Sequence, residues 1–297
     1  MKINVKKIVP EKNFDIIGLS YIGSPKPNTA MFITKKVENL LGALEHVNEC
    51  LIFAETGINI SAELNDKHAF VFTNKPNLSY AKFAKMFEEK RFKEEVSQKV
   101  ILTEGGWYKN ETASIGENAY IEPGCFIGPD VQIGNNARLL AGTIIRHASI
   151  GDNFLSNECS VIGANGFTMA EDEDGNKFRI PTLGRVIIGN NVEIGAHDNI
   201  SCGSGGDTII EDNVKIDALV HIGHDVHLHQ NVEITAGGII GGFDDLGDHA
   251  YVGINAVTRN RISIGDRAVI GMGSTVTKSV DTETTVVGNP ARLLKKQ

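Results

Sequence analysis

The C-terminal half of the chain carries an aliphatic residue at almost every sixth position. Between residues 210 and 276, eleven of twelve such positions are aliphatic, and Thr258 is the exception. The twelve positions are Ile210, Ile216, Ile222, Leu228, Ile234, Ile240, Leu246, Val252, Thr258, Ile264, Ile270 and Val276. A period of six fits neither the 3.6-residue turn of an α-helix nor the two-residue alternation of an ordinary strand. It is typical of the hexapeptide repeats of a parallel β-helix.

This period has a simple geometric interpretation. Each hexapeptide forms one short strand and a turn, and three of them close a triangular coil of about 18 residues. The aliphatic side chain then points into the prism and stacks on its equivalents in neighbouring coils, which supplies a core that no repeat has alone. Gly and Asn at the corners accept the positive φ that β-branched residues resist. We therefore expect a mainly β protein whose principal element is a parallel β-helix.

The repeat begins near Ile115 and is interrupted twice. Between residues 163 and 185 the period disappears over a stretch too long for a corner turn, so we expect a loop extruded from the prism. Long loops on rigid scaffolds often carry function. A second interruption inserts four residues at 203–206. These limits predict a β-helix over 101–285, including the loop, and a C-terminal tail over 286–297.

Residues 1–100 have no sixfold period. Short apolar runs, such as Ala30–Thr34 and Ala69–Thr73, alternate with more polar segments that are compatible with helices. This alternation predicts a small α/β domain in front of the β-helix. The family resemblance given below makes this domain a candidate for binding a nucleotide-linked sugar.

Composition narrows the classes of partner. The formal net charge of −8 argues against nucleic acid or an anionic membrane as the main partner. The four cysteines are scattered without a CxxC pair, which favours reduced thiols in a cytoplasmic protein. The N-terminus has no apolar core of signal-peptide length, and no apolar run is long enough to cross a membrane. We expect a cytoplasmic protein without a transmembrane segment.

Several segments together resemble the UDP-3-O-acylglucosamine N-acyltransferases of lipid A synthesis. They are the stretches 74–81 (NKPNLSYA), 161–167 (VIGANGF), 180–189 (IPTLGRVIIG) with 192–196 (VEIGA), and 216–225 (IDALVHIGHD). The resemblance implies a homotrimer of left-handed β-helices with active sites between neighbouring subunits. It also implies N-acyl transfer to a nucleotide-linked amino sugar, and a place in lipopolysaccharide biosynthesis.

The chain departs from that family in three places. Its ending, 287–292 (VGNPAR), resembles that of CoA-dependent sugar acetyltransferases, in place of the family's helical extension. Phe32 matches one member of an expected base-stacking aromatic pair, but the following residues offer no second aromatic. A further family histidine falls near Arg261. We therefore expect transfer from acyl-CoA or acyl carrier protein to a dTDP- or UDP-linked amino-deoxyhexose. The alternative is a UDP-3-O-acylglucosamine N-acyltransferase using 3-hydroxyacyl carrier protein. Neither reaction needs a tightly bound cofactor, because the acyl donor is a co-substrate.

Acyl transfer from a thioester to an amine needs a base and donors for a tetrahedral oxyanion. The densest histidine run lies at 221–229, and within it His224 falls two residues past an inward position, near a corner. Histidine suits a base near neutral pH, and His224 also occupies the place of the family's catalytic base. Gly242 lies one coil further on, and its N–H matches the family's oxyanion donor. Asp217 matches a family aspartate; either Asp217 or Asp225 can orient the imidazole or hold the substrate amine.

Other candidate residues concern binding. Phe167 can line an acyl or sugar pocket, Phe32 can stack on a base, and His221 and Asp225 lie beside the candidate base. Arg292 and Lys295 can contact the phosphates of CoA, although a solvated tail explains them equally well.

Two readings from other classes stay open. Histidines spaced three, three and two residues apart resemble a ligand cluster, and some trimeric left-handed β-helices are zinc-type hydratases. On a six-residue period, however, these histidines are expected to fall on different faces of the coil, so we expect no metal site. The remaining reading is a non-catalytic scaffold used for binding or assembly.

Overall fold

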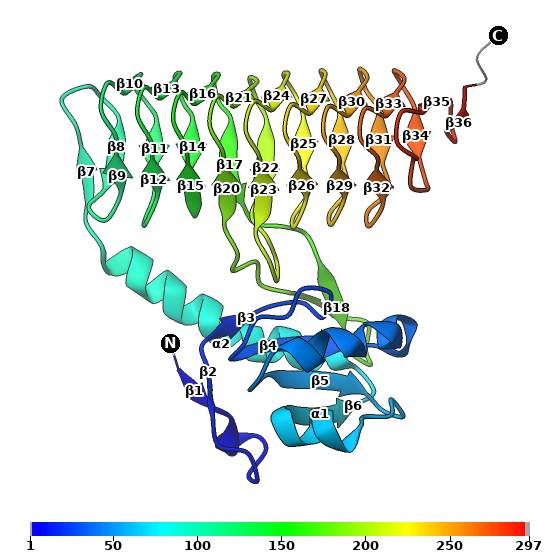
Figure 1. Ribbon diagram of the computed structural model, residues 1–297. Helices are drawn as coiled ribbons and strands as arrows, with labels where there is room; N and C mark the ends of the chain where they lie inside the picture. The colour runs from blue at the N-terminus through cyan, green and yellow to red at the C-terminus, as the bar shows by residue number, and fades with distance from the viewer. Residues whose placement is uncertain (1, 295–297) are drawn as a thin grey trace. The chain divides into compact units, whose positions relative to one another are not determined.

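The computed structural model describes residues 2–294, and the chain divides into two compact units (Figure 1). The first consists of Met1–Val96, Phe167–Leu183 and Ser204–Gly206, and the second of Ser97–Gly166, Gly184–Gly203 and Asp207–Gln297. The chain therefore leaves the second unit twice and returns to it. Within residues 2–294, no helix is long and apolar enough to cross a membrane.

Three sheets of short strands make up the second unit, and from β8 to β17 successive strands along the chain pass from one sheet to the next. The first sheet contains β7 (Val100–Leu102), β8 (Tyr108–Asn110), β11 (Phe126–Ile127), β14 (Ile144–Ile145), β17 (Val161–Ala164), β22 (Asn199–Ser201), β25 (His221–Ile222), β28 (Ile239–Ile240), β31 (Val257–Thr258) and β34 (Thr275–Val276). The second contains β9 (Ser114–Ile115), β12 (Gln132–Ile133), β15 (Ala148–Ile150), β20 (Val186–Ile188), β23 (Thr208–Ile210), β26 (His227–Leu228), β29 (Asp245–Leu246) and β32 (Ser263–Ile264). The third contains β10 (Tyr120–Ile121), β13 (Arg138–Leu139), β16 (Leu155–Ser156), β21 (Glu193–Ile194), β24 (Lys215–Ile216), β27 (Glu233–Ile234), β30 (Tyr251–Val252), β33 (Val269–Ile270), β35 (Thr285–Val287) and β36 (Arg292–Leu293).

The register follows from the sixfold period. Ile216 pairs with Ile234, which pairs with Val252, so each aliphatic residue lies beside its equivalent 18 residues later. All three are at most 4% exposed and belong to one continuous core. Apart from β7–β8 at one end and β35–β36 at the other, the strand pairs in these sheets are parallel. The expected left-handed parallel β-helix, with a small α/β part before it, is confirmed.

The corners of the prism recur at the same period. Between residues 213 and 273, positive φ occurs at Asn213, Leu219, Asp225, Asn231, Gly237, Phe243, His249, Asn255, Arg261, Arg267 and Gly273. Asn and Gly accept this left-handed conformation readily, whereas a bulky side chain does not. Leu219 and Phe243 are therefore unusual among these corners.

The first unit has a parallel four-stranded sheet in the order β3 (Gly18–Leu19), β4 (Thr29–Ile33), β5 (Leu51–Glu55) and β6 (Ala69–Thr73). Its other elements before residue 98 are β1 (Ile3–Asn4), η1 (Val5–Lys7), β2 (Asp15–Ile16), η2 (Lys35–His46), α1 (Ala62–Lys67) and α2 (Pro76–Ser97). Helix α2 contributes buried side chains, including Leu78 and Phe83, to a core shared with the sheet. This is the alternation of apolar runs and helices that the sequence predicts.

Residues from the interruption of the repeat complete this first core. Strands β18 (Met169–Glu171) and β19 (Lys177–Arg179) form an antiparallel hairpin. Ala170 and Ile180 are almost fully buried in the same cluster as Leu78. Within the unit, the guanidinium of Arg91 on α2 donates to the carbonyl oxygen of Thr182 at 2.9 Å. The hairpin is thus an integral part of the first unit.

Candidate functional site

His224 lies at a corner of the β-helix, two residues after β25. Strand β25 fixes its place because Ile222 points into the core, and Asp225 forms the corner with a φ of 58°. The imidazole Nδ1 lies 2.8 Å from Oδ2 of Asp225, and the two side chains are 15% and 3% exposed. When Nδ1–H donates to this carboxylate, Nε2 carries the lone pair. Asp225 therefore orients an imidazole, the side chain whose chemistry suits a general base.

Gly242 occupies the equivalent place in the next coil. The N–H of Phe243 donates to the carbonyl oxygen of His224 at 2.9 Å, which connects the two corners. A Cβ at position 242 would lie 3.0 Å from His224 Nε2 and 3.1 Å from Cε1, so a larger residue would displace the imidazole. Among residues 2–294, the N–H of Gly242 has no hydrogen-bond acceptor. A backbone N–H beside a base is the arrangement that can stabilise an oxyanion.

Phe243 and Arg261 extend this corner. The ring of Phe243 meets that of His224 edge to face, with centroids 5.1 Å apart, and the guanidinium carbon of Arg261 lies 3.8 Å from the centroid of the Phe243 ring. Phe243 holds this position with a φ of 63°, a conformation that is strained for an aromatic residue. Sequence reasoning did not select Phe243. The available signal was an aromatic residue at a corner position where the neighbouring coils carry Asp225 and Arg261.

Two buried acids are also absent from the predicted residues. Asp244 accepts the N–H of Ile262 at 3.0 Å and contacts the hydroxyl of Thr258 at 2.5 Å. Burial raises the pKa of Asp244 to about 6 against the lowering effect of these hydrogen bonds. Asp198 accepts the N–H groups of Gly195 and Val220, and burial raises its pKa to about 7, with a smaller contribution from Asp217. Both occupy inward positions where the repeat ordinarily has a small or β-branched residue.

The structure distinguishes the other residues predicted near the base. Asp225 contacts the imidazole, whereas Asp217 is exposed and accepts the N–H of the following residue, Ala218, at 2.7 Å. His221 lies on β25 itself, and its pKa is lowered by desolvation first and by His224 second. Of the two acids considered, Asp225 is therefore placed to orient His224.

The predicted binding residues outside this corner have separate surroundings. Within the first unit, Phe32 on β4 is half-buried with its ring centroid 5.3 Å from that of Tyr80 on α2. Tyr80 is an aromatic neighbour that the sequence around Phe32 does not reveal. Phe167 is 77% exposed, and the guanidinium carbon of Arg179 lies 5.1 Å from its ring centroid. In the second unit Arg292 is exposed on β36, while Lys295 lies outside the described residues.

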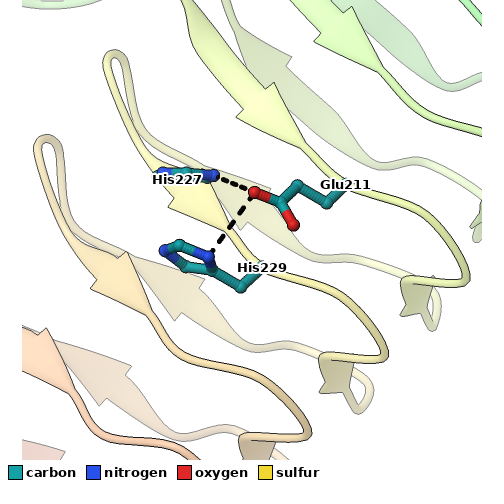
Figure 2. Close-up of side chains that lie close together, drawn as sticks. All are labelled: Glu211, His227 and His229. Carbon is teal, nitrogen blue, oxygen red and sulfur yellow. Dashed lines mark hydrogen bonds and ion pairs between the residues drawn. The ribbon is translucent and has the colours of Figure 1, made fainter.

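One expectation about the histidines is wrong. His227 and His229 lie on the same face of the β-helix, with ring centroids 3.8 Å apart, and both approach Glu211 (Figure 2). They share a face because both flank the inward-pointing Leu228, and side chains alternate across a strand. One atom of each of Glu211, His227 and His229 lies within 4.8 Å of the others. Residues that could hold a metal ion therefore do converge within one chain.

Comparisons with known proteins agree with the repeat. The pattern of the bacterial transferase hexapeptide family (six repeats) matches residues 112–147. A UDP-3-O-acylglucosamine N-acyltransferase of Herminiimonas arsenicoxydans is 36% identical over 155 residues, covering 50% of this chain and 44% of that protein. One of the same name from Coxiella burnetii is 33% identical over 232 residues, covering 69% of this chain and 64% of that protein. The chain spans about half the length of several of these curated relatives.

Solved structures show the same fold. The UDP-N-acetylglucosamine acyltransferase from Campylobacter jejuni has 25% identity and a TM-score of 0.56, covering 64% of this chain and 72% of that one. The UDP-N-acetylglucosamine O-acyltransferase from Moraxella catarrhalis has 23% identity and a TM-score of 0.59, and the match covers 65% of this chain and 74% of that one. The resemblance to hexapeptide-repeat acyltransferases is thereby confirmed. The curated relatives described above carry the name of the UDP-3-O-acylglucosamine alternative.

Proposed function

We propose that the protein transfers an acyl group from an acyl thioester to the amine of a nucleotide-linked amino sugar, with a UDP-linked 3-O-acylglucosamine as the first candidate acceptor. The observation that carries this proposal is the His224–Asp225 pair facing Gly242 across one coil. The relatives' names support the acceptor, and either acyl-CoA or acyl carrier protein is a suitable donor. An assembly of three chains and a place in lipopolysaccharide biosynthesis are parts of the same proposal.

The groups at this corner have separate roles in the proposed reaction. Nε2 of His224 accepts a proton from the substrate amine as nitrogen attacks the thioester carbonyl, while Asp225 holds the imidazole in the productive orientation. The N–H of Gly242 donates to the carbonyl oxygen as it becomes an oxyanion. The tetrahedral intermediate then collapses: the carbon–sulfur bond breaks, the His224 imidazolium returns its proton to the leaving sulfur, and the thiol and the amide remain. Each transferred proton has a named acceptor, and no oxidant or reductant is needed.

Thiol release measured with defined donors and acceptors tests the proposal. Wild-type protein is assayed with 3-hydroxyacyl carrier protein or acyl-CoA, and with UDP-linked 3-O-acylglucosamine or dTDP-linked amino-deoxyhexoses. We expect His224→Ala to lose at least about 10²-fold in turnover, the lower end for removal of a general base. His249→Asn is the matched control, because His249 is an exposed corner histidine and Asn accepts its φ of 58°. Wild-type-like turnover in His224→Ala would remove His224 from the mechanism.

Gly242→Ala tests the close approach of Gly242 to the His224 imidazole. The added Cβ would crowd Nε2 at 3.0 Å and force the imidazole to shift. Because small misplacements of a catalytic group are costly, we expect turnover to fall at least about 10-fold. The KM for the acceptor should change less than kcat. Gly273→Ala in a coil further along is a poor control because its φ is 65°, so His249→Asn again serves. Undiminished kcat in Gly242→Ala would contradict the proposed contact.

A further inference from the structure

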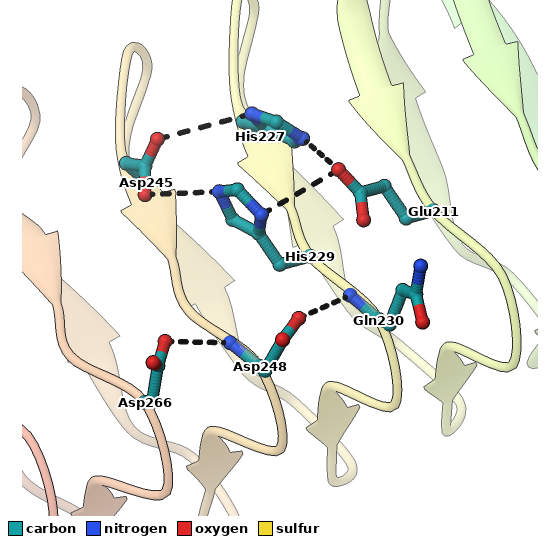
Figure 3. Close-up of polar contacts among 7 residues, drawn as sticks. All are labelled: Glu211, His227, His229, Gln230, Asp245, Asp248 and Asp266. Atoms are coloured by element: carbon teal, nitrogen blue, oxygen red, sulfur yellow. Dashed lines mark hydrogen bonds and ion pairs between the residues drawn. The ribbon is translucent and has the colours of Figure 1, made fainter.

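A second cluster of ionisable side chains lies on a flat face of the β-helix and spans three consecutive coils. Glu211 follows β23, His227 and His229 lie on and just after β26, and Asp245 begins β29 (Figure 3). The three strands are hydrogen-bonded neighbours in one sheet, and the register pairs His227 with Ile209 on one side and with Asp245 on the other. The β-helix thus brings together residues that are up to 34 positions apart in the sequence (245 − 211).

The two imidazoles stack between the two carboxylates. On one side, Oε1 of Glu211 lies 2.7 Å from Nε2 of His227 and 3.5 Å from Nδ1 of His229. On the other side, the Asp245 carboxylate lies 3.8 Å from Nδ1 of His227 and 3.3 Å from Nε2 of His229. Each ring therefore directs one nitrogen towards Glu211 and the other towards Asp245. The ring planes are inclined by 25°, which keeps both Glu211-facing nitrogens on one side.

We propose that Glu211, His227 and His229 bind a zinc-type divalent cation, and that Asp245 holds the two imidazoles from the opposite side. Two imidazole nitrogens and a carboxylate oxygen form a donor set that zinc uses, with water completing a tetrahedral site. A carboxylate behind a ligating histidine fixes its tautomer and orientation, and Asp245 is nearest to that role at His229, 3.3 Å away, while its 3.8 Å separation from His227 is longer than a hydrogen bond. The site is distinct from the His224 corner, and its residues are neither the general base nor the oxyanion donor proposed there.

The donor atoms can reach one ion only after the two imidazoles rotate apart, because rings stacked with centroids 3.8 Å apart and planes inclined by 25° direct their in-plane lone pairs nearly parallel. Metal–ligand distances of about 2.0–2.2 Å in a tetrahedral site separate neighbouring donors by roughly 3.3 Å. The 3.5 Å separation of Glu211 and His229 already has that size, while the 2.7 Å separation of Glu211 and His227 is that of a hydrogen bond. Replacing the shared proton with a cation requires this pair to open by about 0.6 Å. These three side chains are 30–32% exposed, so they have room to rotate and the ion has a path of entry.

Charge also favours a divalent cation. With neutral imidazoles, Glu211 and Asp245 give the cluster a formal charge of −2, since each carboxylate carries one negative charge. A cation bound only by the native arrangement stabilises the folded state by mass action. Because its ligands come from consecutive coils, it would act as a clip between β23 and β26. The predicted consequence is a zinc-dependent rise in the unfolding temperature of the β-helix.

Zinc titration of the untagged full-length protein tests this site. After removal of metal by chelation, isothermal titration calorimetry near neutral pH should show one zinc ion per chain. Co²⁺ should give the visible absorption of a tetrahedral site. We expect Glu211→Gln and His229→Gln each to weaken zinc binding by more than about 100-fold, and Asp245→Asn to weaken it by about 10- to 100-fold, the range for residues that orient metal ligands. His249→Asn should leave the titration unchanged.

Two results would overturn the proposal. One is the absence of stoichiometric zinc binding by the wild-type protein. The other is undiminished binding by the His227→Gln/His229→Gln double variant, which would place the ion elsewhere, for example at the exposed Cys159. A larger loss in Asp245→Asn than in Glu211→Gln would contradict the assignment of the ion to the Glu211 side. The thermal unfolding of each variant without metal shows that it is folded, so a lost titration reports on binding.

Discussion

The His224 corner and the Glu211–His227–His229 face lie three residues apart on the chain, yet they use the repeat in opposite ways. The corner departs from it: Phe243 takes a left-handed conformation, Asp244 places a carboxyl in the core, and Gly242 leaves space beside the imidazole. The face follows it, since each of its side chains occupies an ordinary outward position. A site at a corner therefore costs folding stability, whereas a site on a flat face of the β-helix is nearly neutral.

The largest expected effect on folding stability comes from Asp244, the buried carboxyl next to the corner. Its pKa of about 6 in the folded state exceeds the ordinary value of 3.8 because of burial. The folded protein therefore holds this proton over a pH range in which the unfolded chain has lost it, so stability falls as pH rises from about 4 to 6. At about 1.36 kcal/mol per pH unit, the loss amounts to about 3 kcal/mol.

Asp244→Asn should remove the part of the pH dependence that Asp244 causes, while buried Asp198 keeps its own, and should leave the variant more stable than wild type above pH 6. Chemical unfolding followed by the fluorescence of Trp107, the single tryptophan, which lies in the second unit, measures it. If the free energies of unfolding of the two proteins changed in parallel with pH, burial of Asp244 would not be what lowers stability.

A smaller effect is expected at Phe243. Left-handed backbone costs an L-residue with a bulky side chain about 1–2 kcal/mol, and Asn tolerates it better. Phe243→Asn should therefore raise the free energy of unfolding by about 1 kcal/mol, after the lost contacts with His224 and Arg261 are counted. The same variant should lose turnover in the thiol-release assay.

The reverse change, Asn231→Phe, is the matched control, because Asn231 has a φ of 60° at an ordinary corner. It should destabilise the protein by a similar amount without affecting turnover. Stabilisation by Asn231→Phe, or destabilisation by Phe243→Asn, would contradict the claim that the left-handed backbone at Phe243 costs folding stability.

The smallest effect should appear on the flat face. Without metal, His229→Gln removes an exposed contact, and surface substitutions of this kind usually change stability by no more than about 0.5 kcal/mol. Urea unfolding of the chelated protein measures this. A loss of several kcal/mol would mean that the ion-pair cluster, and not a bound cation, is what stabilises these coils.

Most of the β-helix could be predicted from the sequence, because a strict six-residue period fixes which side chains point inward, lie at corners or point outward. Once Ile222 and Leu228 point inward, the corner position of His224 and the outward direction of His227 follow. The period alone does not show which outward side chains meet across coils, because a long side chain can also reach a residue that lies diagonally opposite in the next coil. Glu211 and His227 are 16 residues apart, not 18, because one follows its strand and the other lies on it.

Irregular residues of the candidate site were harder to predict. Asp244 and Phe243 interrupt the pattern that made the rest readable, so the repeat gives no expectation for them. Tyr80 meets Phe32 only because α2 packs on the sheet of the first unit. The short segment containing Ala170 and Ile180 shows no period, and its burial depends on residues more than seventy positions earlier, such as Leu78.

The placement of that hairpin has a consequence for synthesis on the ribosome. Ala170 and Ile180 belong to the core that Leu78 and Phe83 begin, and Ser204–Gly206 belong to the same unit. The portion of the protein that is translated first therefore cannot finish its own interior until more than two hundred residues have emerged, by which time several coils are available to stack. Chains usually complete their domains in order from the N-terminus. Here completion of the first unit is delayed until part of the second has been made, and a protein truncated near residue 100 would expose an unfinished core.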